Sequence, residues 1–202
     1  PTKSAIANPN INYYLNIESN NIPYIMIHAF YEELEPLSIT MDDEKGGFLQ
    51  TEHLIELGHR KIAGLFKTDD RQGTKRMKGY IKAHRAYGLQ LNPNIIFTYS
   101  SDNKYTRPAI EFERMLQSED PPTAVVCYND ELAVLLLEVL RKNNIKVPDD
   151  ISIVGFDDSQ FARVSEVKLT TIKHPHSEMG TKAAKMILDL ANNQNKSSSD
   201  NK

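Results

Sequence analysis

The sequence predicts an α/β protein with a parallel sheet that helices cover on both faces. Three observations support this fold class: five short apolar runs suit buried strands, segments of helical periodicity lie between them, and glycine or proline marks several segment ends. Strands and helices that alternate in this way are joined by right-handed crossovers, which make the strands parallel. In such sheets ligands bind beyond the carboxyl ends of the strands, so we expect the functional residues there.

The predicted strands are apolar runs of five or six residues, a typical strand length. Because both faces of a parallel sheet are buried, these runs need not alternate with polar residues. They comprise residues 24–28, 62–66, 95–99, 124–128 and 151–156.

The segments between and after these runs have the residue spacing of helices. They comprise residues 44–57, 73–87, 108–116, 130–143 and 176–191. Gly58 and Gly88 stop the first two helices as left-handed caps, and Pro108 suits a first turn because N–H groups there lack an intrahelical partner. Residues 130–143 are apolar nearly all round, which is typical of a helix packed on a sheet. The polar residues 192–202 are predicted to be disordered because they have too few apolar side chains to bury.

The composition limits the possible functions. The chain has 202 residues, of which 40% are hydrophobic and 25% charged, enough for one large domain or two small ones. A net charge of −3 and scattered basic residues form no positive patch, so we expect that this chain alone does not bind DNA. The single cysteine, Cys127, excludes an intrachain disulfide, favours a reducing compartment and lies in an apolar run typical of a buried structural thiol.

The ends of the chain also carry information about location. No apolar run is long enough to span a membrane, and the first residues lack the features of a signal peptide, so we expect a cytoplasmic protein. The chain opens at Pro1 rather than at a methionine, which suggests a processed product or a piece of a longer protein.

Two adjacent carboxylates, Asp157 and Asp158, follow the last predicted strand. They fit a simple polar turn, a metal or phosphoacceptor site such as that of a receiver domain, or hydrogen-bond acceptors for a polyol. A metal site would need further carboxylates, which Asp69 and Asp70 could supply only if the two strand ends are neighbours. A carboxylate that accepts bonds from two vicinal hydroxyls suits a sugar in a cleft.

Two further polar residues lie next to predicted strand ends. Asn129 follows a strand and opens a helix, so it is expected to cap that helix and could also present its side chain to a ligand. Arg76 lies in the first turns of another helix, where it is either a solvated surface charge or a planar fork that binds ring hydroxyls.

His28, His174 and Tyr99 each close an apolar run at a predicted strand end. Tyr99, like Tyr128, could lie against the C–H face of a sugar or could simply pack in the core. No metal-binding spacing of histidine or cysteine occurs, and no nucleotide-binding loop or activated nucleophile is visible. We therefore expect neither a metal, nor a cofactor, nor an enzymatic activity.

Four stretches of the sequence resemble one known family. They read DDEKGGFLQTEHLIELGHRKIAGL, GTKRMKGYIKAH, PPTAVVCYNDELAVLLLEVLRKNNIKVPDDISIVGFDDS and LTTIKHPHSEMGTKAAKMIL. Together they are similar to the effector-binding domain of lac/galactose-repressor-type transcription regulators, over residues 22–190 in unbroken order. Within that family the details look most like the arabinose-responsive members of Bacillus-type bacteria.

The resemblance implies a two-subdomain fold like that of periplasmic binding proteins, with an effector in the cleft between the subdomains. It implies a remainder of the amino-terminal subdomain at residues 1–40, a carboxyl-terminal subdomain at 41–158, a return segment at 159–191 and a disordered tail from 192. It also implies that the amino-terminal subdomain is incomplete, and that a separate DNA-binding domain is absent from this chain. Such a chain is expected to bind sugar weakly or not at all, and to expose sheet edges that favour self-association.

The family pattern carries ligand contacts onto this sequence residue by residue. They fall on His28, Arg76, Asn129, Asp157 and His174, with Tyr99 as a further contact. The function implied is that of a sugar-sensing domain, for L-arabinose, in a homodimeric transcriptional repressor whose operator binding weakens allosterically when sugar binds. A periplasmic-type sugar-binding protein of a transporter is the alternative.

Overall fold

The structure is a computed structural model that describes residues 10–31 and 33–199. The chain forms two compact units. The larger unit comprises residues 42–174, and the smaller one combines residues 1–41 with residues 175–202.

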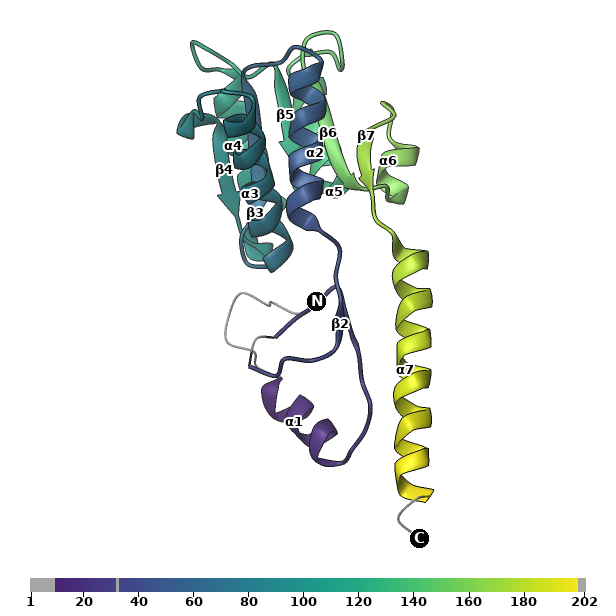
Figure 1. Cartoon of the computed structure of the whole chain (residues 1–202). Coiled ribbons are helices and arrows are strands. Elements are labelled where there is room, and N and C mark those ends of the chain that lie inside the picture. The colour runs from purple at the N-terminus through teal and green to yellow at the C-terminus, as the bar shows by residue number, and fades with distance from the viewer. Residues whose placement is uncertain (1–9, 32, 200–202) are drawn as a thin grey trace. The chain divides into compact units, whose positions relative to one another are not determined.

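A parallel sheet of five strands forms the centre of the larger unit (Figure 1). Its strands are β3 (Ile62–Lys67), β4 (Ile96–Tyr99), β5 (Ala124–Cys127), β6 (Ser152–Asp157) and β7 (Thr170–Lys173), in the order β4-β3-β5-β6-β7. All four pairings are parallel, and Gly64 of β3 faces Ile96 on one side and Val126 on the other. The predicted α/β class with a parallel sheet is confirmed.

Helices cover both faces of this sheet. They are α2 (Asp43–Glu56), α3 (Arg71–Ala86), α4 (Arg107–Leu116), α5 (Asp130–Lys142) and α6 (Gln160–Val164), with short 3-10 turns at Pro93–Ile95 and Ser101–Asn103. Gly58 and Gly88 adopt positive φ angles of 96° and 65° after α2 and α3, as the sequence predicts for left-handed caps.

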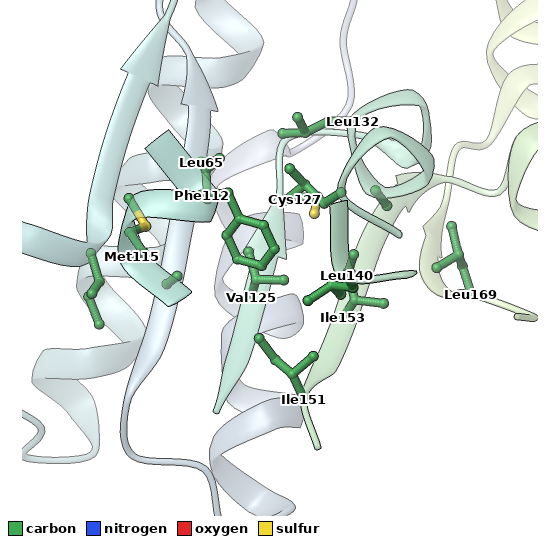
Figure 2. Close-up of a cluster of buried hydrophobic side chains, with 14 of the residues drawn as sticks. Leu65, Phe112, Met115, Val125, Cys127, Leu132, Leu140, Ile151, Ile153 and Leu169 are labelled. Atoms are coloured by element: carbon green, nitrogen blue, oxygen red, sulfur yellow. The ribbon is translucent and has the colours of Figure 1, made fainter. Parts of the chain in front are cut away.

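Two apolar cores form because successive strand residues point to opposite faces. Ile62 and Phe66 of β3 pack with α2 and α3, whereas Ala63 and Leu65 pack with α4 and α5. Figure 2 shows the second core, in which Phe112 of α4 lies near Leu65, Val125 and Cys127. Cys127 is fully buried there, and burial raises the pKa of its thiol well above the usual value.

Close packing of α2 against α3 positions the first site residues. A Cβ atom on Gly47 would collide with the backbone of Arg76, and one on Gly79 would collide with the backbone of Glu44. Only glycine allows the two helices to approach so closely. The approach brings the first turn of α2 next to the first turns of α3.

The smaller unit has less regular structure. It contains α1 (Ile11–Ser19), the two-residue parallel strands β1 (Met26–Ile27) and β2 (Ser38–Ile39), and the long helix α7 (His176–Ser199). Its buried cluster consists of Ile39, Met179 and Ala183. A single face of α7 therefore packs on this short pair of strands.

The structure differs from the sequence prediction in several elements. The predicted strand 24–28 is only two residues long, and α1, β2 and α6 were not predicted. Strand β7 is the apolar run that His174 closes, for which the sequence predicts a strand end but no bounds. The larger unit ends at residue 174 rather than 158, because β7 pairs with β6 and so belongs to the same sheet. Helix α7 runs to residue 199, past residue 192 where the sequence predicts a disordered tail, through a segment without glycine or proline. Residues 200–202 of the predicted tail lie outside the described residues.

Candidate functional site

The carboxyl edge of the five-stranded sheet gathers most of the predicted site residues. Arg76 lies on α3, and Asp157 is the last residue of β6. The chain leaves β3 and β5 there and enters α3 and α5, so helix N-termini and strand ends meet at one edge.

Arg76 is buried, with only 2% of its surface exposed, which excludes the alternative of a solvated surface charge. Its Nε donates to Asp43 Oδ1 at 2.9 Å, and its Nη1 donates to the carbonyl of Tyr128 at 2.7 Å. Its Nη2 lies 3.6 Å from Asp157 Oδ1. The guanidinium also stacks on two rings, 3.5 Å from the centroid of Phe156 and 4.9 Å from that of Tyr128. Arg76 is therefore a fixed cation that faces Asp157.

Asp157 is the most exposed carboxylate of this cluster, with 30% of its side chain accessible. Burial is the main cause that raises its pKa to about 6. Arg76 opposes this shift, whereas the carboxylates of Asp130, Asp43 and Asp70 reinforce it. At neutral pH the carboxylate is ionised and only partly compensated, so it is a strong acceptor for hydroxyl groups.

Asp157 and the next residue have unusual backbone angles. The φ angle is 107° at Asp157 and 50° at Asp158, both in the left-handed region that non-glycine residues rarely adopt. Asp158 turns away from the cluster, and its carboxylate pairs with Arg163 Nη2 at 3.1 Å. Of the two adjacent carboxylates, Asp157 is thus the one that contacts Arg76.

The sequence interpretation missed Asp43 as a site residue. Asp42 and Asp43 both stand at the start of α2, but only Asp42 caps the helix, by accepting from the Lys45 N–H at 2.9 Å. Asp43 is 3% exposed and is turned to Arg76 instead. The sequence contains one signal for this role of Asp43 as the partner of Arg76. Two acidic residues stand together at the helix start, and the helix needs only one of them as a cap.

Lys67 and Asp70 form a second ion pair at the same edge. Lys67 Nζ lies 2.8 Å from Asp70 Oδ2, and Tyr128 Oη donates to the same oxygen at 2.8 Å. The other oxygen of Asp70 caps α3 by accepting from Gly73 N–H at 2.7 Å. These bonds hold the ring of Tyr128 near both cations, 5.8 Å from Lys67 Nζ and 4.9 Å from Arg76 Cζ, measured from the ring centroid.

A small cavity of about 130 Å³ adjoins Tyr128. Tyr99 and Tyr128 meet there edge to face, with ring centroids 6.4 Å apart. Its remaining lining residues include Lys67, Lys104, Tyr105, Asn129 and Glu131. Tyr99 is 5% exposed, so it contributes to the core as well as to this cavity. Aromatic faces combined with donors and acceptors are the usual lining of a site for a small polar ligand.

Asn129 caps α5, as the sequence predicts. Its side-chain oxygen accepts from the Leu132 N–H at 3.0 Å. Because the cap occupies that oxygen, Asn129 would present the two N–H groups of its amide to a ligand.

The two predicted histidines lie in different units. His174 follows β7, is 8% exposed, and its backbone N–H donates to the carbonyl of Asp157 at 3.2 Å. His28 follows β1 in the smaller unit, has a φ angle of 56°, and donates its N–H to Ile39 at 2.7 Å. The larger unit therefore carries Arg76, Tyr99, Asn129, Asp157 and His174, and His28 belongs to the smaller one.

Two features are absent from the part of the chain that the structure describes. Within residues 10–31 and 33–199, no three acidic, histidine or cysteine side chains are grouped to hold a metal ion. Over the same described ranges, no helix combines the length and the apolar character needed to cross a bilayer.

Similarity to known proteins agrees with this architecture. Residues 51–201 match the family described as periplasmic binding protein-like domain. The arabinose metabolism transcriptional repressors of Halalkalibacterium halodurans and Geobacillus stearothermophilus are 56% and 54% identical, over 97% and 94% of this chain. The chain spans about half the length of these curated relatives, 52% and 53%.

A solved structure shows the same fold. The crystal structure of a LacI transcriptional regulator from a Rhodococcus species superimposes with a TM-score of 0.76 at 31% sequence identity, covering 88% of this chain and 65% of that one. The resemblance predicted from the sequence is thus confirmed, and the chain belongs to the family of periplasmic binding protein-like domains in the form found in LacI-type regulators.

Proposed function

We propose that this chain is the sugar-sensing part of a bacterial transcriptional repressor, that L-arabinose is its effector, and that it acts in the cytoplasm. The observation that carries the proposal is the contact between Arg76 and the partly exposed Asp157 beside a cavity lined by tyrosines. An ionised carboxylate, a fixed guanidinium and aromatic faces are the groups that bind a polyol through its hydroxyls and C–H surfaces.

The names of the two curated relatives, both arabinose metabolism transcriptional repressors, support arabinose as the sugar. The proposed binding residues are Arg76, Asn129, Asp157, His174 and Tyr99 of the larger unit, with His28 of the smaller unit. Sugar binding would favour one arrangement of the two units and so weaken operator binding by a separate DNA-binding domain. A coupling free energy of about 1–3 kcal/mol is typical of such linkage.

Calorimetric titration of the full-length protein with L-arabinose, D-xylose and D-galactose tests the proposal. We expect heat with arabinose and a clearly weaker signal with the other two sugars. If none of the three sugars produces heat, the sugar assignment is wrong. An operator fragment added to the same samples separates the two candidate classes, because a transporter-type sugar-binding protein binds sugar without releasing DNA.

We also propose that the protein is a homodimer that pairs through a face formed by α5, the last residue of α6 and the segment after it. A cleft of about 510 Å³ lies there, lined by Val134 and Leu137 together with residues 145–147 and 164–167. Val164 is 81% exposed at its rim, an unusual position for an apolar side chain unless a partner covers it.

Substitution Val164→Asp tests this second proposal by placing a charge in the paired face. Analytical ultracentrifugation at micromolar concentration should then show a shift from dimer to monomer. Leu57→Asp, at another exposed apolar residue (63% exposed), is the matched control and should leave the dimer intact. Dimers that persist with Val164→Asp would refute the assignment of this face.

A further inference from the structure

The bend after β6 is held by a residue that belongs to another element. Asp157 and Asp158 both have left-handed backbone angles, an arrangement that costs free energy and persists only where neighbouring groups impose it. The groups that surround the bend therefore determine where the carboxylate of Asp157 lies.

Asp130 supplies the contacts on one side of the bend. It lies in the first turn of α5 and is fully buried. Its Oδ2 accepts from the Ser159 N–H at 2.8 Å, and its Oδ1 accepts from the Thr171 hydroxyl at 2.6 Å. The buried charge is thus compensated by two charge-assisted hydrogen bonds.

Thr171 completes the arrangement from β7. Its hydroxyl oxygen accepts from the Asp158 N–H at 3.3 Å while its proton is given to Asp130. The N–H groups of two consecutive residues, Asp158 and Ser159, are therefore both tied to Asp130, one directly and one through Thr171.

Gly155 shows that the strand is adapted to this carboxylate. A Cβ atom on Gly155 would collide with Asp130 Oδ1, so the carboxylate lies directly on the backbone of β6 two residues before Asp157. Capping of α5 does not explain the position of Asp130, because Asn129 is the capping residue.

We propose that Asp130 and Thr171 are positioning residues that hold the bend at Asp157 and Asp158 and thereby fix the Asp157 carboxylate opposite Arg76. This inference rests on the proposed function, because it assigns a role in sugar binding to two residues that need not touch the sugar.

The test uses the full-length protein and calorimetric titration with L-arabinose, together with thermal denaturation. Thr171→Val keeps the shape of the side chain and removes the hydroxyl, whereas Thr171→Ser keeps the hydroxyl. Thr170→Val is the matched control, because Thr170 is the exposed neighbour on the same strand. We expect Thr171→Val to weaken binding about five- to tenfold, and Thr171→Ser and Thr170→Val to stay within about twofold of the wild type.

A purely structural role is separated by a second control. Ile62→Val lowers thermal stability from the buried amino end of β3, away from the bend, and should leave the dissociation constant unchanged. If Thr171→Val and Ile62→Val weaken binding equally, or if Thr171→Ser fails to restore it, the inference is wrong.

Two outcomes distinguish this inference from the proposed function. Sugar binding that is lost with Asp157→Ala but unchanged with Thr171→Val overturns the inference and leaves the proposed function intact. Binding that is unchanged with Asp157→Ala overturns the proposed role of Asp157 itself. Should Thr171→Val fail to fold, Asp130→Asn decides, because it keeps the shape and removes the charge; unchanged affinity with Asp130→Asn also refutes the inference.

Discussion

The two edges of the five-stranded sheet are stabilised in different ways. At the amino edge, the ring of His59 bridges two strands through Thr123 Oγ1 at 2.9 Å and Ser152 Oγ at 3.0 Å. At the carboxyl edge, the buried cation of Arg76 lies between two carboxylates, and consecutive residues adopt left-handed angles.

The difference shows where the protein tolerates unfavourable free energy. Neutral hydrogen bonds with ordinary geometry, as at the amino edge, add stability at little cost. A cluster of carboxylates around one arginine is costly to bury, and such costs are typical of binding sites rather than of scaffolds. The comparison predicts that substitutions at the carboxyl edge alter sugar binding, whereas those at the amino edge alter only stability.

The largest effect is expected for Arg76→Leu. It removes the buried partner of Asp43 and leaves that carboxylate without its cation, which should lower the free energy of unfolding by about 3–5 kcal/mol. Urea denaturation followed by circular dichroism measures this loss. The double substitution Asp43→Asn with Arg76→Leu should recover part of it, because no buried charge is then left unpaired. No recovery in the double variant would mean that the ion pair is not the source of the stability.

The next effect is expected for Asp157→Ala, and it concerns binding rather than folding. The substitution removes a charge-assisted acceptor for sugar hydroxyls. We expect the binding free energy for L-arabinose to weaken by about 2–3 kcal/mol, which raises the dissociation constant roughly 30- to 150-fold. Stability at neutral pH should not fall, because Arg76 keeps its bond to Asp43 and the removed carboxylate is one whose ionised form burial disfavours. Asp158→Asn is the matched control, because it removes the neighbouring charge and keeps a residue type that tolerates the left-handed angle, and it should bind normally. An unchanged dissociation constant for Asp157→Ala would remove this residue from the site.

The sequence predicted the central strands of the sheet because their burial leaves a pattern in the residues. Strands β3, β5 and β6 are buried on both faces and therefore appear as unbroken apolar runs. The two-residue strands β1 and β2 leave no such pattern, because most of their neighbours are irregular.

The site could be predicted only in part. Asp157 and Asn129 stand at strand ends, where topology alone suggests function, and Arg76 was assigned by resemblance. Asp43 and Thr171 act through partners 33 and 41 residues away along the chain, and no local periodicity records such contacts. Their roles depend on the packing of α2 on α3 and of β7 on β6, which only the folded structure provides.

A change of pH is expected to alter the affinity for sugar by an intermediate amount. The pKa of Asp157 is raised to about 6 from its ordinary value of 3.8, with burial as the main cause and Asp130, Asp43 and Asp70 opposing Arg76. If sugar binds the ionised form, affinity should fall by up to about tenfold per pH unit below 6. Calorimetric titration between pH 5 and pH 8 measures this, and Asp157→Asn should abolish the pH dependence. A flat profile in the wild type would contradict the assignment.

The same shift sets the sign of the effect of pH on stability. Between about pH 4 and pH 6 the folded state binds more protons at Asp157 than the unfolded state does. This contribution to the free energy of unfolding is therefore present at low pH and is lost as the pH rises through 6. Comparison of urea midpoints for the wild type and Asp157→Asn isolates it.

The smallest effect is expected at the amino edge. His59→Leu removes two hydrogen bonds to hydroxyl groups that remain partly accessible to water, so we expect a loss of about 1 kcal/mol in the free energy of unfolding. Burial lowers the pKa of His59, so the unfolded state binds a proton more readily and the wild type should lose stability as the pH falls below about 6.5. The variant should lack this acid-dependent loss, which urea midpoints at pH 7.5 and pH 5.5 would show. Its affinity for L-arabinose should equal that of the wild type; weaker binding would mean that the amino edge also influences the site and that the two edges are not separate in function.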